Sequence, residues 1–162
     1  MILVALGANL SSPTHGGPRA TLEAALGALD RAGLSVVARS AWYETTPVPV
    51  SDQPWYVNGV AAVTSPLGAA DLLGALHRIE ADFGRVRAEA NAARVLDLDL
   101  LAYHDLVSTD WPLLPHPRLA ERAFVLRPLA DVVPDWRHPV SGLGIDAMLA
   151  GIGPGQSTRR LP

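Results

Sequence analysis

Four stretches of the chain carry the apolar pattern of β-strands. The first, residues 2–6, is a short continuous apolar run that ends at Gly7, as in a strand buried within a sheet. The fourth alternates leucine with aspartate, the period of two that gives a strand two different faces. The predicted strands are residues 2–6, 34–43, 56–63 and 95–103.

Two stretches between these strands repeat apolar residues every three or four positions, which is the spacing of an amphipathic helix. They predict helices over about residues 18–32 and 67–83, and a short third helix is expected near residues 118–124. The order of strands and helices is therefore βαββαβ. This order predicts an α+β protein with the ferredoxin-like fold, in which an antiparallel sheet carries the helices on one face and functional loops on the other.

Length and composition favour one folded domain. The chain has 162 residues, of which 49% are hydrophobic and 18% are charged, and these values are typical of a globular protein. We expect a single domain over residues 1–162 with its core over about residues 1–150. Residues 151–162 are rich in Gly, Pro and Arg, and they predict a mobile tail.

Charge and cysteine content exclude several kinds of protein. The formal net charge of -3 argues against a nucleic-acid partner, which would require a basic surface. The absence of cysteine excludes disulfides and thiolate metal sites. The N-terminus has no basic leader, and no apolar run reaches membrane-spanning length. We therefore expect a cytoplasmic protein that binds neither nucleic acid nor membrane.

The fourth predicted strand carries two carboxylates, Asp97 and Asp99, on one face. Residues two apart on a strand lie about 6.5 to 7 Å apart, and two acids flanked by leucines repel each other. A divalent cation removes this repulsion, and Mg²⁺ usually binds through one or two carboxylates together with phosphate oxygens. The alternative is a strand edge with two solvated acids.

Three arginines, Arg85, Arg87 and Arg94, lie just before the acid pair, although the whole chain has only 13 Lys and Arg residues. A guanidinium group pairs with two phosphate oxygens at once and keeps its charge. Arginines beside a carboxylate-bound metal are typical of a polyphosphate site. The alternative is a solvated loop in which the arginines balance acids such as Glu80 and Glu89.

Two other segments carry candidate binding groups. Residues 44–58 combine prolines and small polar groups with the rings of Trp55 and Tyr56, which suits either a flat nitrogen-rich heterocycle or a turn with core aromatic residues. His116 lies between two prolines and could donate to a phosphate, carry a proton or be structural. The sequence contains no Gly-x-x-x-x-Gly-Lys-Ser/Thr loop, so metal and arginines would have to hold any phosphates.

Several motifs that follow one another along the chain resemble a single family, 6-hydroxymethyl-7,8-dihydropterin pyrophosphokinase of folate biosynthesis. The Leu-Asp-Leu-Asp run with its upstream arginine is the most specific of them. The matching stretches are Leu6–Leu10, Tyr43–Pro47, Asp52–Asn58, Ile79–Glu80, Gly84–Arg87, Arg94–Asp99, Pro115–His116 and Arg122–Phe124.

The resemblance implies an enzyme that transfers the β,γ-diphosphate of ATP to the hydroxymethyl group of 6-hydroxymethyl-7,8-dihydropterin and releases AMP. It implies two Mg²⁺ ions bound by Asp97 and Asp99, with ATP as co-substrate. Arg85 and Arg94 match the family's catalytic, phosphate-contacting arginines. We expect the enzyme to act as a monomer.

The resemblance also implies binding roles for single residues. The pterin ring would lie between Tyr56 and Phe124, and Asn58 would read its amide edge. The implied pterin contacts are Thr45, Pro47, Val48, Tyr56, Asn58 and Phe124. The implied ATP contacts are Glu80, Arg87, Arg94, Leu100, His116 and Arg122.

One segment departs from the family, and two other functions suit the same fold. Residues 88–93 lack the tryptophan and the basic residue that members often carry there, which implies weaker closure over the pterin. A module that binds a nucleotide or pterin without turnover would not need paired metal carboxylates. An RNA-binding domain would need a basic surface with exposed aromatic residues.

Overall fold

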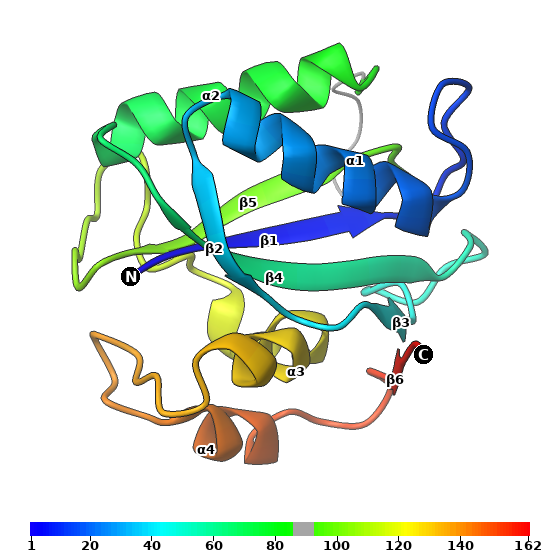
Figure 1. Ribbon diagram of the computed structural model, residues 1–162. Coiled ribbons are helices and arrows are strands. Elements are labelled where there is room, and N and C mark those ends of the chain that lie inside the picture. The colour runs from blue at the N-terminus through cyan, green and yellow to red at the C-terminus, as the bar shows by residue number, and fades with distance from the viewer. Residues whose placement is uncertain (86–92) are drawn as a thin grey trace.

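Six strands form one antiparallel sheet in the computed structural model, which describes residues 1–85 and 93–162 (Figure 1). Neighbouring strands follow the order β5-β1-β4-β3-β6, and β2 also pairs with β4. The strands are β1 (Ile2–Ala8), β2 (Ser35–Arg39), β3 (Tyr43–Thr45), β4 (Tyr56–Thr64), β5 (Asp97–Tyr103) and β6 (Thr158–Arg160). The helices are α1 (Pro18–Arg31), α2 (Ala69–Asp82), the 3₁₀ helix η1 (Leu119–Glu121), α3 (Ala123–Val132) and α4 (Ile145–Ala150).

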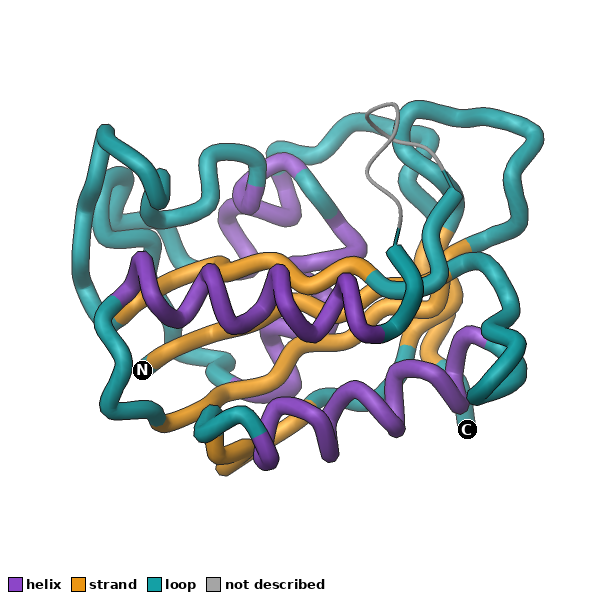
Figure 2. The backbone as a smooth tube through the Cα atoms, turned by 90° about the horizontal axis from the view of Figure 1, so that it is seen from above, coloured by secondary structure: helices purple, strands orange, loops and turns teal. Residues whose placement is uncertain are grey.

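Helices α1 and α2 cover one face of the sheet, as the prediction of two amphipathic helices required. Both helices extend along the strands in Figure 2. Every second side chain of β1 enters the layer between sheet and helices, beginning with Ile2 and Val4, and Leu98 and Leu100 of β5 join them there. The leucine stripes of α1 and α2 complete this layer, which is the larger of two apolar cores.

The second core lies on the opposite face, so the prediction that the helices occupy only one face is wrong. Helices α3 and α4 pack there against the alternate side chains of the same strands, such as Leu3 and Val60 (Figure 1). Only a short helix near residues 118–124 was expected in this part of the chain. Pro128 lies inside α3, and a proline normally indicates the end of a helix, so the sequence pattern concealed the rest of this helix.

The second predicted strand, residues 34–43, is in fact two strands that both pair with β4. The chain breaks away between them at Ser40, whose hydroxyl accepts a hydrogen bond from the backbone N–H of Val60 at 2.9 Å. The ring of Trp42 then lies so close over Gly59 that a side chain there would collide with it. After this break, β3 pairs with β4 from Tyr43 onward, and the chain then enters the proline-rich loop.

The C-terminal segment also has a fixed place in the sheet. Residues 158–160 form β6, which pairs with β3 so that Tyr43 faces Arg160 and Thr45 faces Thr158. The sequence pattern did not predict this strand, and the mobility of residues 151–162 stays a prediction. Each helix that the structure describes in residues 1–85 and 93–162 is too short or too polar to cross a bilayer.

Candidate active site

The floor of the candidate site is a row of three residues on neighbouring strands. Gly7 of β1 pairs with Asp97 of β5 on one side and with Asn58 of β4 on the other. Side chains at paired positions project from the same face of a sheet. A Cβ atom on Gly7 would lie 2.5 Å from Oδ1 of Asn58, so glycine at this position leaves the space between the acid and the amide open.

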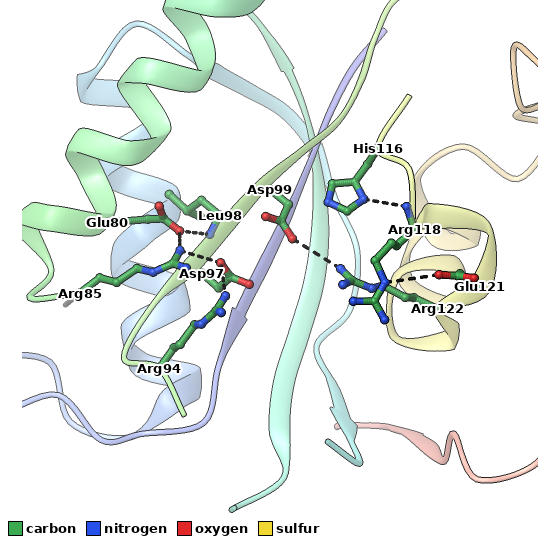
Figure 3. A network of polar contacts seen from close by, with 10 residues as sticks. All are labelled: Glu80, Arg85, Arg94, Asp97, Leu98, Asp99, His116, Arg118, Glu121 and Arg122. Carbon is green, nitrogen blue, oxygen red and sulfur yellow. Dashed lines mark hydrogen bonds and ion pairs between the residues drawn. The ribbon is translucent and has the colours of Figure 1, made fainter. Parts of the chain in front are cut away.

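The two acids are held between arginines that come from both sides (Figure 3). Oδ1 of Asp97 accepts a hydrogen bond from Arg85 at 2.8 Å and lies 3.1 Å from a guanidinium nitrogen of Arg94. Oδ2 of Asp99 lies 3.9 Å from Arg122, at the start of α3. The alternation of β5 turns both acids away from the leucines, which enter the core beneath α1 and α2.

Asp99 is the most perturbed of the acids in this site. Burial raises its pKa from 3.8 to about 7, and the negative charge of Asp97 adds to this effect, whereas Arg122 opposes it. Arg122 thus does not fully offset the cost of ionising this buried carboxyl group. A cation beside Asp99 would supply the remaining positive charge.

Glu80 lies beneath the acid pair and holds it in place. Its side chain is 2% exposed, and Oε2 accepts hydrogen bonds from the backbone N–H of Leu98 at 2.8 Å and from Arg85. Arg85 donates at the same time to Asp97, so the chain of contacts runs from α2 to the strand that carries the acids. Burial raises the pKa of Glu80, and the hydrogen bond from Leu98 and the charge of Arg85 oppose this shift.

His116 faces the acids as a neutral imidazole. Burial, followed by the charge of Arg122, lowers its pKa to about 4. The backbone N–H of Arg118 donates to Nδ1 at 3.1 Å, so Nε2 carries the proton. Because a group with so low a pKa seldom takes up a second proton at neutral pH, the role of proton carrier fits this histidine least, and hydrogen-bond donation by Nε2 fits its neutral form.

A hollow of about 250 Å³ opens above the floor and joins the acids to the proline-rich loop. Tyr56 and Phe124 line it with rings, and the guanidinium of Arg122 lies 5.3 Å above the centre of the Phe124 ring. The amide of Asn58 donates to the hydroxyl of Thr45 at 2.6 Å, which fixes its orientation at the floor. The hollow therefore combines ring faces, an oriented amide and a charged acid–arginine cluster.

The side chain of Asn9 connects two segments that line the hollow. Its amide donates to the side chain of Gln53 and to the carbonyl of Pro54, both at 3.0 Å. Its Oδ1 accepts the backbone N–H of Arg94 at 2.8 Å. One buried side chain thus ties the proline-rich loop to the segment that carries Arg94.

A family model matches most of the chain. The model described as 7,8-dihydro-6-hydroxymethylpterin-pyrophosphokinase (HPPK) matches residues 3–134. The chain belongs to the HPPK family. The resemblance that the sequence motifs indicated is therefore confirmed.

Individual relatives match between 82% and 99% of the chain. The 2-amino-4-hydroxy-6-hydroxymethyldihydropteridine pyrophosphokinase of Pseudomonas aeruginosa is 43% identical over 164 residues, which cover 99% of this chain and 96% of that protein. The protein of the same name from Haemophilus influenzae is 37% identical over 140 residues, 85% of this chain and 84% of that protein. A mitochondrial folate synthesis bifunctional protein of Arabidopsis thaliana is 39% identical over 82% of this chain, which corresponds to 23% of that protein.

A solved HPPK structure has the same fold. A triple mutant of Plasmodium falciparum HPPK-DHPS superposes with a TM-score of 0.70 at 14% sequence identity, covering 92% of this chain and 43% of that one. A mixed α/β architecture built on an antiparallel sheet is thus shown for this chain.

Most of the residues expected in an HPPK site come together in the structure. The residues around the hollow that the sequence identified are Thr45, Pro47, Val48, Tyr56, Asn58, Arg94, Asp97, Asp99, His116, Arg122 and Phe124. Arg85 lies behind Asp97 and contacts it directly. Arg87, and residues 88–92 of the departing segment, lie outside the described residues.

Two expected ATP contacts are not brought to the hollow. Leu100 is 4% exposed in the core beneath α1 and α2, and Glu80 is buried against Leu98 and Arg85. Three further residues line the hollow that were not predicted from the sequence, namely Thr46, Gln53 and Arg118. Each of them lies within or beside a stretch that matched the HPPK motifs, and this position could have indicated a place in the site.

The donor set of this HPPK site fits Mg²⁺ carried by a nucleotide. Asp97 and Asp99 offer two carboxylates, and Arg122 does not fully offset the cost of ionising Asp99. In the part of the chain that the structure describes, no group of three His, Asp or Glu side chains could hold a metal on its own. Magnesium commonly takes one or two protein carboxylates and completes its shell with phosphate oxygens and water, which matches this pair.

The raised pKa of Asp99 predicts how the stability of the metal-free protein depends on pH. Between pH 3.8 and about 7 the folded carboxyl keeps a proton that the unfolded chain has released. The free energy of unfolding therefore falls as the pH rises through this range. In EDTA, calorimetry should show the Tm of the wild type falling relative to that of Asp99→Asn as the pH is raised. Parallel Tm curves for the two proteins would contradict the shift.

Proposed function

We propose that this HPPK protein transfers the β,γ-diphosphate of ATP to the hydroxymethyl group of 6-hydroxymethyl-7,8-dihydropterin and releases AMP. The observation that carries the proposal is the hollow in which the acid pair and its arginines lie next to Tyr56, Asn58 and Phe124. Charged phosphates and a flat heterocycle thus find matching groups at adjoining positions. The family match and the P. aeruginosa relative, which is named as this pyrophosphokinase, support the reaction.

The polar end of the hollow would bind ATP. Asp97 and Asp99 would hold two Mg²⁺ ions, which neutralise phosphate charge and lower the pKa of the attacking hydroxyl group. Arg94 and Arg122 lie beside these acids and would stabilise the charge of the moving diphosphate and of departing AMP. His116 would donate its Nε2–H to a phosphate oxygen.

Arg85 would act through Asp97. It lies between Glu80 and Asp97 and donates to both carboxylates. Because its side chain is only 12% exposed, the contact fixes the Asp97 carboxylate rather than leaving it to move in solvent. The role that we assign to Arg85 is to orient Asp97, a proposed metal ligand.

The other end of the hollow would bind the pterin. Tyr56 and Phe124 would stack on its ring, and the oriented amide of Asn58 would pair with its amide edge. Thr45, Pro47 and Val48 would close the side of the pocket. The order of β5, β1 and β4 would then bring the hydroxymethyl group toward the acids, since Gly7 keeps the path between Asn58 and Asp97 open.

The strand order also supports a ferredoxin-like core. Strands β1, β2, β4 and β5 together with α1 and α2 follow one another as βαββαβ, and β1 lies between β5 and β4. In this view β3, β6, α3 and α4 are additions that complete the pocket within a single domain. The expectations of a monomer that works in the cytoplasm stay predictions.

A measurement of AMP release separates this enzyme from a protein that only binds its ligands. Purified protein is incubated with ATP and Mg²⁺, with and without the reduced pterin, and the products are separated by ion-exchange chromatography. We expect AMP and the pterin diphosphate in equal amounts, and only when the pterin is present. Binding of both ligands without AMP, or AMP release without pterin, would refute the proposed reaction.

A further inference from the structure

The C-terminal segment contacts two walls of the hollow through neighbouring residues, Gln156 and Ser157. We call these two residues the clasp. One wall is the start of α3, with Arg122 and Phe124, and the other is the loop that begins at Thr46. The family match ends at residue 134, so it assigns no role to the clasp.

Gln156 binds the two peptide groups on either side of Arg122. Its Oε1 accepts the backbone N–H of Ala123 at 2.9 Å, and its Nε2 donates to the carbonyl of Glu121 at 2.9 Å. The first backbone N–H groups of a helix have no partner within the helix, and α3 has no side-chain cap from Arg122. Gln156 supplies this cap from a distant part of the chain.

Ser157 binds the other wall, at Thr46, through its backbone. Its carbonyl accepts the N–H of Thr46 at 3.1 Å, and its N–H donates to the hydroxyl of Thr46 at 3.1 Å. The next residue, Thr158, pairs with Thr45 in the sheet. Because Gln156 and Ser157 are adjacent, the two walls are connected through the Gln156 side chain and a single peptide bond.

The position of Arg122 makes this restraint relevant to chemistry. Its guanidinium reaches from the backbone that Gln156 holds to within 3.9 Å of Asp99 and lies over Phe124. Both contacts depend on where the peptide of residue 122 lies. Misplacing a reacting or charge-stabilising group by about 1 Å can cost on the order of a hundredfold in rate.

We propose that Gln156 is a positioning residue for diphosphate transfer. Its side-chain amide fixes the backbone around Arg122 so that the guanidinium faces Asp99, and Ser157 ties this wall to the Thr46 loop. The inference deepens the proposed function and rests on it.

A double-mutant cycle with Arg122 tests the proposal. Gln156→Ala is made in the wild type and in Arg122→Ala, and kcat and KM for ATP are measured from AMP release. We expect Gln156→Ala to lower kcat/KM about tenfold in the wild type and less than about twofold once Arg122 is absent, since residues that act through one another are not additive. Gln156→Glu keeps the acceptor for Ala123 and should recover part of the loss.

Arg159→Ala is the matched control. Arg159 lies three residues further along and makes an exposed ion pair with Glu44, at 2.9 Å, so its removal should change kcat/KM less than about twofold in both backgrounds. Equal losses from Gln156→Ala with and without Arg122 would overturn the proposal, because the residue would then act on stability or by another route. Unchanged kinetics in Gln156→Ala would overturn it as well.

Hydrogen exchange tests the clasp without any turnover. The amide of Ala123 should exchange about tenfold faster in Gln156→Ala than in the wild type, because it loses its acceptor. The same rate in both proteins would overturn the clasp. A wild-type protein that releases no AMP would refute the proposed reaction, a result separate from these exchange rates.

Discussion

Changing Asp97 or Asp99 to alanine is expected to lower kcat by more than about a thousandfold, on the order of 4 kcal/mol of transition-state stabilisation. These two carboxylates are the proposed ligands for both magnesium ions, and each lies beside an arginine that should stabilise phosphate charge. The fold should survive, because either change removes one member of a repulsive pair. AMP release at saturating MgATP and pterin measures the loss, and circular dichroism checks the fold.

Asp105→Ala is the control for this pair of variants. Asp105 is exposed just after β5, and its replacement should leave kcat within about twofold of the wild type, as expected for a surface position. Retention of activity in a folded Asp97→Ala or Asp99→Ala protein would show that these acids do not hold the metal.

Changing Glu80 to alanine is expected to lower the free energy of unfolding by about 3–5 kcal/mol, the usual cost of removing one partner from a buried charge pair. The change removes the hydrogen-bond acceptor of the Leu98 N–H and the most buried partner of Arg85. Urea denaturation followed by circular dichroism measures this loss. Activity should fall too, because Arg85 would no longer be held against Asp97.

Two other variants show whether the loss comes from the buried contacts. Glu80→Gln keeps an acceptor for Leu98 but not the charge facing Arg85, so its stability should lie between those of the wild type and Glu80→Ala. Asp82→Ala removes an exposed acid from the same helix and should change the free energy of unfolding by less than about 0.5 kcal/mol. A Glu80→Ala protein as stable as Asp82→Ala would contradict the assignment.

The sequence predicted the elements that have their own periodicity and missed those that depend on distant partners. Helices α1 and α2 and strands β1, β4 and β5 lie close to their predicted positions, because each carries a complete apolar face. Strand β6 has three residues and exists through its pairing with β3. Helix α4 has six residues, too few to display a helical period. Neither has a local pattern strong enough to predict it.

The candidate site could be predicted where a residue type carries its own chemistry. The paired aspartates and nearby arginines indicated phosphate and metal through residue type and spacing alone. The same reasoning places the side chain of Leu100 in the core, since it follows Asp99 directly and must project from the other face of the strand, so any contact that Leu100 makes with ATP would come from its backbone. The roles of Asn9 and Gln156 could not have been foreseen, because their hydrogen-bond partners are at least 33 residues away in sequence.

The alternation of leucine and aspartate along β5 has a consequence for folding fidelity. Asp97 is paired with Gly7 and Asp99 with Ala5. If β5 were to slip by one residue against β1, every side chain would change face, and both carboxylates would enter the apolar layer beneath α1 and α2. Burying unpaired charge is so costly that such a misaligned intermediate would be rejected early. The two aspartates that we assign to catalysis would therefore also disfavour the wrong register of β5 against β1.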